Sequence, residues 1–123
     1  MTGPATLLPP DIGRLGCDVM DTVEEAMAGA DAVMALRLQR ERMERDLMPA
    51  LADYARLWGI DQRRVGLMRP DAVVLHPGPL NRGVEITPEV ADGERSVILE
   101  QVTNGVALRC AVLARCAGAA LGR

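Results

Sequence analysis

Two short stretches of this 123-residue chain combine residue types that could bind a small charged substrate. In the first, Arg37 and Gln39 are separated by one residue, so their side chains share a face if the chain is extended there. A guanidinium group suits a carboxylate, and a carboxamide can donate to a carboxylate or accept from an amine. The pair could therefore hold a small amino acid. The pattern alone favours another interpretation, a solvated helix start with Arg–Glu pairs.

The second stretch is the sequence LHPGPLN, which contains the only histidine of the chain. Pro77 and Pro79 cannot donate backbone hydrogen bonds, so the turn leaves carbonyl oxygens for a ligand that carries N–H groups. The Gly78–Pro79 bond is a plausible cis peptide. A rigid loop that merely ends a strand is the simpler alternative. His76 could be a general base, but a histidine at a buried strand end is more often a structural hydrogen-bonding residue, which is the role we expect.

Each of the two stretches follows an apolar run that is typical of a buried strand. The strand would position the stretch that comes directly after it. These runs are Ala32–Leu36 and Ala72–Leu75, and Cys17–Met20 is a third strand candidate. Helix signals lie between and after them, in the sequences DTVEEAMAGA, PALADYARLW, IDQRRVGLM and TPEVADG. Strands that alternate with helices predict an α/β fold with a parallel sheet, in which ligands bind beyond the carboxyl ends of the strands.

The final segment, RSVILEQVTNGVALRCAVLARCAGAALG, is expected to form one long helix. Its apolar residues fall at spacings of three and four and form one stripe, which consists of Leu99, Val102, Val106, Cys110 and Leu113. Gly105 suggests close packing against another element. All three cysteines lack metal-ligand spacing, and we expect them to be small buried apolar residues.

Composition excludes several classes of function. The 14 basic residues are all arginine, so no lysine chemistry is possible, and the net charge of −3 gives no general attraction to nucleic acid. The start, MTGPATLLPPD, has no basic region of the kind that opens a signal peptide. Arg109 and Arg115 interrupt the most apolar stretch, so no membrane span is expected. We therefore expect a single cytoplasmic domain.

Four segments of the chain together resemble, in order, the carboxyl-terminal half of the aspartate carbamoyltransferase family. They are GPATLLP, GADAVMALRLQRERM, VVLHPGPLNRGVEI and SVILEQVTNGVALRCAVL. The sister ornithine enzymes carry His-Cys-Leu-Pro where this chain has the residues 76–79, and they use a Ser-Met-Gly loop that is not found here. The resemblance therefore favours aspartate over ornithine as the substrate.

The resemblance implies a role for each matching residue. Arg37 and Gln39 match positions that bind L-aspartate. The backbone carbonyls of Pro77 and Gly78 match those that contact the amino group of carbamoyl phosphate, and the bond before Pro79 matches a cis peptide.

Two further residues match less directly. Glu41 is expected to anchor a mobile loop, and Arg82 is assigned to site closure. No catalytic residue of the family matches a residue of this chain, and no metal or organic cofactor is implied.

The resemblance also implies that the chain is incomplete. Family chains are about twice as long or more, and they begin with a carbamoyl-phosphate domain that residues 1–123 lack. The family sheet has the order 3-2-1-4-5, and the chain keeps only strands 3, 4 and 5 of an incomplete Rossmann-like, three-layer aspartate-binding domain. We therefore expect a requirement for an amino-terminal domain or chain, and a homotrimer when complete.

Three functions remain open from the sequence. The first is the aspartate-binding part of a carbamoyltransferase that is inactive alone. The second is a non-catalytic relic or subunit-interaction module of that fold. The third is a carbamoyltransferase for a different amino acid. The Arg37–Gln39 pair favours the first.

Overall fold

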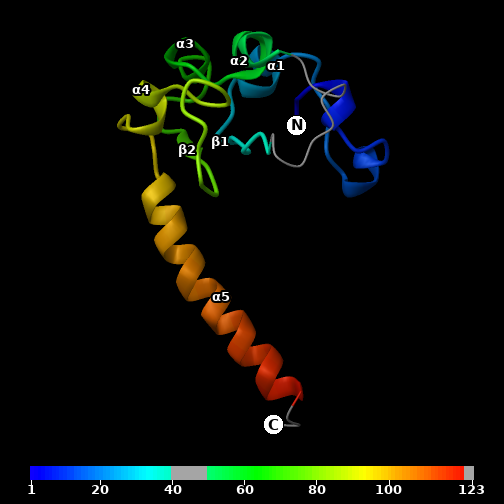
Figure 1. The fold of residues 1–123 in the computed structure, drawn as a ribbon, viewed down its shortest axis with the longest axis vertical. Helices are drawn as coiled ribbons and strands as arrows, with labels where there is room; N and C mark the ends of the chain where they lie inside the picture. The colour runs from blue at the N-terminus through cyan, green and yellow to red at the C-terminus, as the bar shows by residue number, and fades with distance from the viewer. Residues whose placement is uncertain (40–49, 121–123) are drawn as a thin grey trace.

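The computed structural model describes residues 1–39 and 50–120, and within them the fold is α/β, as predicted. Figure 1 shows the helices α1, α2 and α3 grouped beside the strand pair, with α5 running away from this body as a single rod. Along the chain the elements are η1 (Ala5–Leu7), η2 (Ile12–Leu15), α1 (Val23–Met27), β1 (Ala32–Met34), α2 (Leu51–Trp58), α3 (Gln62–Val65), β2 (Val73–Leu75), α4 (Pro88–Ala91) and α5 (Ile98–Ala120).

A pair of parallel strands, β1 and β2, forms within the two runs predicted to precede the candidate site. β1 ends at Met34 rather than Leu36 and is largely exposed, so the prediction that it is buried is wrong. The register of the two strands joins Ala32 to Val73 and Met34 to Leu75. The far edge of β2 bonds to the segment 95–97, because the Val74 N–H donates to the Arg95 carbonyl at 2.8 Å. Among the described residues, β1 has no second strand neighbour. The sheet is therefore open on the β1 side.

The predicted strand Cys17–Met20 is not formed. Its backbone bonds to a single residue, since the Met1 amino group donates to the Asp18 carbonyl at 2.7 Å and the Met20 N–H donates to the Met1 carbonyl at 2.9 Å. A strand needs a neighbouring strand to satisfy its backbone groups. One bonded residue does not provide it, so this prediction is wrong for the described chain.

Local capping explains where α1 begins and ends. The Thr22 hydroxyl accepts from the Glu25 N–H, and the Glu25 carboxylate accepts from the Thr22 N–H, both at 3.2 Å. This reciprocal capping box satisfies two N–H groups that a helix start leaves free. After the helix, Gly29 has a φ of 68°, a backbone conformation that side chains rarely adopt. The predicted helix is confirmed with its start and stop signals.

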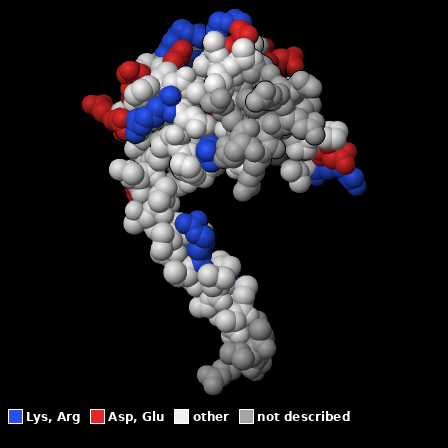
Figure 2. Space-filling view, in the orientation of Figure 1, with Lys and Arg blue, Asp and Glu red and all other residues white. Residues whose placement is uncertain are grey.

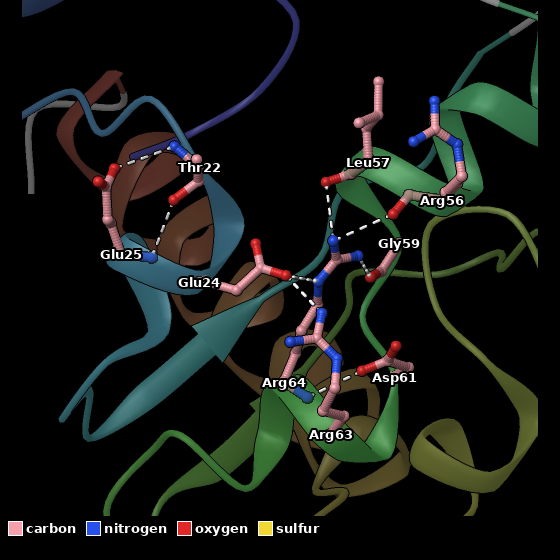
Figure 3. A network of polar contacts seen from close by, with 9 residues as sticks. All are labelled: Thr22, Glu24, Glu25, Arg56, Leu57, Gly59, Asp61, Arg63 and Arg64. Carbon is pink, nitrogen blue, oxygen red and sulfur yellow. Dashed lines mark hydrogen bonds and ion pairs between the residues drawn. The ribbon is translucent and has the colours of Figure 1, made fainter.

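A buried arginine ties α1, α2 and α3 together. Arg64 is only 5% exposed. Its guanidinium donates to Glu24 at 3.0 Å, to the carbonyls of Arg56 and Leu57 at 3.1 Å, and to the Gly59 carbonyl, as Figure 3 shows. We call these five residues the Arg64 cluster.

Gly59 must be a glycine in this cluster. A Cβ there would lie 2.5 Å from the Ala55 carbonyl oxygen and 2.8 Å from that of Val84. Both are backbone atoms, which cannot move aside as the end of a flexible side chain can. This tight backbone packing occurs where the carbonyls at the end of α2 accept from the Arg64 guanidinium.

The long helix α5 is confirmed, but its apolar stripe is not buried. Ile98 is 5% exposed, whereas Leu99 is 83% and Leu113 is 69% exposed. The expected packing of Gly105 against another element is wrong, because the nearest atoms to a Cβ there belong to Arg109 of the same helix. The expectation that the cysteines are buried is also wrong, because Cys17 is half-buried and both cysteines of α5 are exposed. Only the first turn of α5 meets the body, so the stripe has no partner surface among the described residues.

Charge is distributed unevenly between the body and α5. Figure 2 shows charged side chains over the body, whereas most of the surface along α5 is uncharged. No helix in residues 1–39 or 50–120 is long and apolar enough to cross a membrane.

Candidate functional site

The strand register brings the two predicted stretches to the same edge of the sheet. The last paired residues are Met34 and Leu75. Arg37 and Gly78 each follow three residues later, beyond the carboxyl ends of two adjacent parallel strands. This is the edge at which parallel α/β sheets bind ligands.

The residues of the first stretch differ in exposure. The Arg37 side chain is half-buried and Gln39 is exposed. The backbone from 35 to 39 follows β1 without helix, so the alternative of a helix start does not apply to these residues. Glu41 lies outside the described residues.

The second stretch forms a turn with unusual backbone geometry. The peptide bond between Gly78 and Pro79 is cis, the geometry that the resemblance implies, and Gly78 has a φ of 66°. Pro77 and Pro79 are exposed, and neither has an N–H to donate. At the strand end, the two prolines of the turn therefore offer backbone carbonyl oxygens as acceptors and no N–H donors.

Two buried polar side chains, those of His76 and Glu85, support this turn. His76 is 0% and Glu85 is 2% exposed. The Gly78 N–H donates to His76 Nδ1 at 2.8 Å, and His76 Nε2 lies 3.3 Å from Glu85 Oε1. The His76 N–H donates to Gln101 Oε1, at the start of α5, at 2.9 Å. Both ring nitrogens have partners within the chain, which is the hydrogen bonding expected of a structural histidine.

Asn81 connects the two strand ends. Its N–H donates to Glu85 Oε1 at 2.5 Å, and its side-chain amide donates to the Leu38 carbonyl at 3.0 Å. Leu38 stands between the two predicted aspartate-binding residues. We call His76, Asn81, Glu85 and Gln101 the turn support, because they link the turn to the end of β1 and to α5.

Two cavities flank the strand pair. One, of about 570 Å³, lies between Pro77 and the first half of α5, where Gln101 and Arg109 line it. The other, of about 300 Å³, lies along the open edge of β1 and is lined by Tyr54 and Glu85 among others. Of the predicted site residues described here, only Pro77 lines either cavity, so the site is an open surface at the strand ends.

Burial of Tyr54 beside the second cavity raises the pKa of its hydroxyl. Loss of solvent, and then the negative charge of Glu85, raise the pKa of its hydroxyl above the usual 10.0. Glu85 Oε2 is buried there with no hydrogen-bond partner among the described residues. Glu85, which lines this cavity, therefore has one buried carboxylate oxygen whose bonding capacity is unused.

Arg82 pairs with a carboxylate at the end of α4. Its guanidinium makes a two-pronged ion pair with Asp92, at 2.5 and 2.9 Å. The pair raises the pKa of Arg82 and lowers that of Asp92. Both side chains are largely exposed. A role of Arg82 in site closure would require this pair to open.

The residues of the turn support, apart from His76, were missed by sequence reasoning. Glu85 carried a usable signal, since a carboxylate between Val84 and Ile86 interrupts an apolar run. Asn81 and Gln101 carried none. In residues 1–39 and 50–120, no three His, Cys, Asp or Glu side chains gather in a group that could hold a metal ion.

The strand-end geometry agrees with a family match along the chain. Residues 15–116 match the family described as aspartate/ornithine carbamoyltransferase, Asp/Orn binding domain. The chain therefore belongs to the aspartate/ornithine carbamoyltransferase family, and the part that matches is the domain that binds the amino acid.

Within the family, the chain is similar to catalytic subunits of aspartate carbamoyltransferases. The chain is 55% identical, over 113 residues, to the aspartate carbamoyltransferase catalytic subunit of Ruminiclostridium cellulolyticum, covering 92% of this chain and 36% of that protein. It is 55% identical to the corresponding subunit of Myxococcus xanthus, covering 94% of this chain and 39% of that one. The chain thus spans little more than a third of the curated relatives it matches.

A solved structure of the family has a similar fold. Aspartate transcarbamoylase from Trypanosoma cruzi, in complex with carbamoyl phosphate, superposes with a TM-score of 0.69 at 28% identity, covering 91% of this chain and 38% of that one.

Proposed function

We propose that this chain is the aspartate-binding part of an aspartate carbamoyltransferase catalytic subunit. The observation that carries the proposal is the juxtaposition at one sheet edge. Arg37 and the carbonyl turn each follow a paired strand by three residues, and Asn81 joins the two strand ends through Leu38. The match to a family that acts on aspartate or ornithine supports this reading.

In the proposed reaction, the amine of L-aspartate attacks the carbonyl carbon of carbamoyl phosphate. The new C–N bond forms, the C–O bond to phosphate breaks, phosphate leaves with the electron pair, and the amine loses a proton. Arg37 and Gln39 would bind the carboxylates of aspartate, and the Pro77 and Gly78 carbonyls would accept from the carbamoyl amino group. Catalysis by these residues is positioning of the two substrates.

The remaining parts of the site belong to the proposed partners. An amino-terminal domain, or a chain that supplies it, would bind carbamoyl phosphate, and the completed subunit would form a homotrimer in the cytoplasm. The product, N-carbamoyl-L-aspartate, is a precursor in pyrimidine biosynthesis. The length of the relatives, of which this chain covers about a third, supports the need for a further domain.

Complementation tests the proposal. The chain is mixed with an amino-terminal domain taken from the Ruminiclostridium cellulolyticum relative, and N-carbamoyl-L-aspartate is measured with carbamoyl phosphate and L-aspartate as substrates. We expect product only in the mixture. No product in the mixture would overturn the enzymatic proposal and favour a non-catalytic subunit-interaction module. Product with L-ornithine in place of aspartate would overturn the substrate.

A matched pair of arginine variants tests the site. Arg37→Ala is expected to raise the KM for aspartate by 10-fold to 100-fold, the loss of about 1.5–3 kcal/mol for hydrogen bonds to a charged group. Arg14→Ala is the control, because Arg14 is exposed and pairs only at 3.6 Å with Asp11. Equal KM values for the two variants would refute the assignment of Arg37.

A further inference from the structure

The turn support contains a histidine whose tautomer can be assigned from its partners. The Gly78 N–H donates to His76 Nδ1 at 2.8 Å, so this nitrogen must carry a lone pair. The hydrogen of the neutral ring then lies on Nε2, which faces Glu85 Oε1 at 3.3 Å. Glu85 is a hydrogen-bond acceptor at that position, so it favours this tautomer over the other.

The same hydrogen bond determines where one carbonyl points. The Gly78 N–H and the Pro77 carbonyl belong to one peptide unit. The only cis bond among the described residues is Gly78–Pro79, so the Pro77–Gly78 unit is trans. In a trans unit the N–H and C=O point in opposite directions. With its N–H held on the buried ring, the unit directs the Pro77 oxygen away from the ring, toward the exposed side of the turn.

Glu85 also holds the other strand end. Its Oε1 accepts from the Asn81 N–H at 2.5 Å, and the Asn81 side chain donates to the Leu38 carbonyl at 3.0 Å. One carboxylate oxygen therefore fixes both the histidine tautomer and the residue that connects the two strand ends.

We propose that Glu85, acting through His76 and Asn81, is the positioning residue that aims the Pro77 carbonyl at the strand-end site and keeps that carbonyl in register with Arg37. The inference rests on the proposed function, because that function supplies the substrate that the Pro77 carbonyl would contact. His76 takes part as a tautomer-locked acceptor and transfers no proton.

The first experiment uses the unmodified chain. His76 is the only histidine, so the chain gives a single pair of imidazole ¹⁵N signals. We expect the chemical shifts of a ring protonated on Nε2 only, together with slow hydrogen exchange of the Gly78 amide. A ring protonated on Nδ1 would overturn the proposal, because it could not accept from Gly78.

The second experiment compares His76→Asn with His76→Gln. An Asn side chain places an acceptor near the position of Nδ1, and a Gln side chain places one near Nε2. In the complemented enzyme, His76→Gln should lower kcat about tenfold or more, the expected cost of a displaced positioning group, with a smaller change in the KM for aspartate. His76→Asn should retain most of kcat. Equal losses in the two variants would overturn the proposal.

Gly78 amide exchange separates this inference from the proposed function. It is measured on the chain itself, so it does not depend on product formation. If the mixture makes no product, the proposed function fails. The exchange rate still decides whether His76 holds the turn: faster exchange in His76→Gln than in His76→Asn supports the hydrogen bond, and equal rates refute it.

Discussion

The Arg64 cluster and the turn support are both buried and polar, but they use their bonding capacity differently. In the Arg64 cluster every guanidinium nitrogen has a partner within the chain. In the turn support, Glu85 Oε1 accepts twice while the buried Oε2 has no partner among the described residues. Buried polar groups are costly unless they are bonded. The first cluster is therefore closed and structural, whereas the second leaves one buried acceptor oxygen unused.

The largest expected effect comes from breaking the closed cluster. Arg64→Met leaves three carbonyls without their donor, while Glu24 keeps its contact with Arg63. A buried acceptor left without a donor costs roughly 1–3 kcal/mol, so we expect a total loss of about 3–5 kcal/mol. The free energy of unfolding of the full chain, measured by urea denaturation, should fall by that amount. Arg63→Met is the control, since Arg63 lies on the same helix and contacts the same carboxylate but its side chain is 63% exposed. A comparable loss in the control would contradict the closed-cluster interpretation.

A smaller effect is expected when the turn support is broken. Glu85→Leu deprives the His76 ring and the Asn81 N–H of their acceptor, at roughly 1–3 kcal/mol for each buried donor. Part of this cost is offset because the substitution also removes the unpartnered Oε2. We expect a net loss of about 2 kcal/mol in the same denaturation measurement.

Glu85→Gln is the matched control for that prediction. Its amide oxygen can still accept from both donors, so its stability should stay within about 1 kcal/mol of the original chain. A loss in Glu85→Leu as large as in Arg64→Met would mean that the two clusters do not differ.

The smallest effect concerns Glu24 and pH. A hydrogen bond from Arg63, then one from its own backbone, then one from Arg64, lower the pKa of the Glu24 carboxyl from 4.5 to about 2. Because the folded-state pKa is depressed, the contribution is full above about pH 4.5 and is lost as the pH falls toward 2. The side chain is 35% exposed, so solvent screening reduces the contribution to about 1 kcal/mol.

Comparing the chain with Glu24→Gln isolates that contribution. The difference in unfolding free energy should be present at pH 6 and shrink between pH 4.5 and 2. A difference that does not change over that interval would show that the Arg63 and Arg64 contacts do not stabilise the ionised form.

The sequence could predict an element where the residues that determine it lie within or next to that element. The Thr22–Glu25 capping box and the stop at Gly29 are local, and α1 forms where they place it. The runs before Arg37 and His76 are apolar and short, and both form strands. Cys17–Met20 has a similar composition, but a strand also requires a neighbour, which its own residues cannot specify.

The sequence indicated the candidate site through residue types at the strand ends rather than through the residues that support them. Arg37 and the proline turn stand out by residue type. Arg64 does not, because it follows another arginine, and only the register of α3 decides which of the two is buried. Asn81 is equally ordinary in sequence, and its importance arises from a contact with Leu38, 43 positions away. Such pairings are properties of the folded topology.

The exposed stripe of α5 has a consequence for the life of the chain in a cell. Chaperones and proteases continuously sort proteins by how much of their surface resembles an unfolded state. A helix on which Leu99, Leu108 and Leu113 are each more than 65% exposed presents such a surface even when the body is folded. The abundance of this chain therefore depends on whether α5 is covered, so its level at steady state would report on the presence of a binding partner.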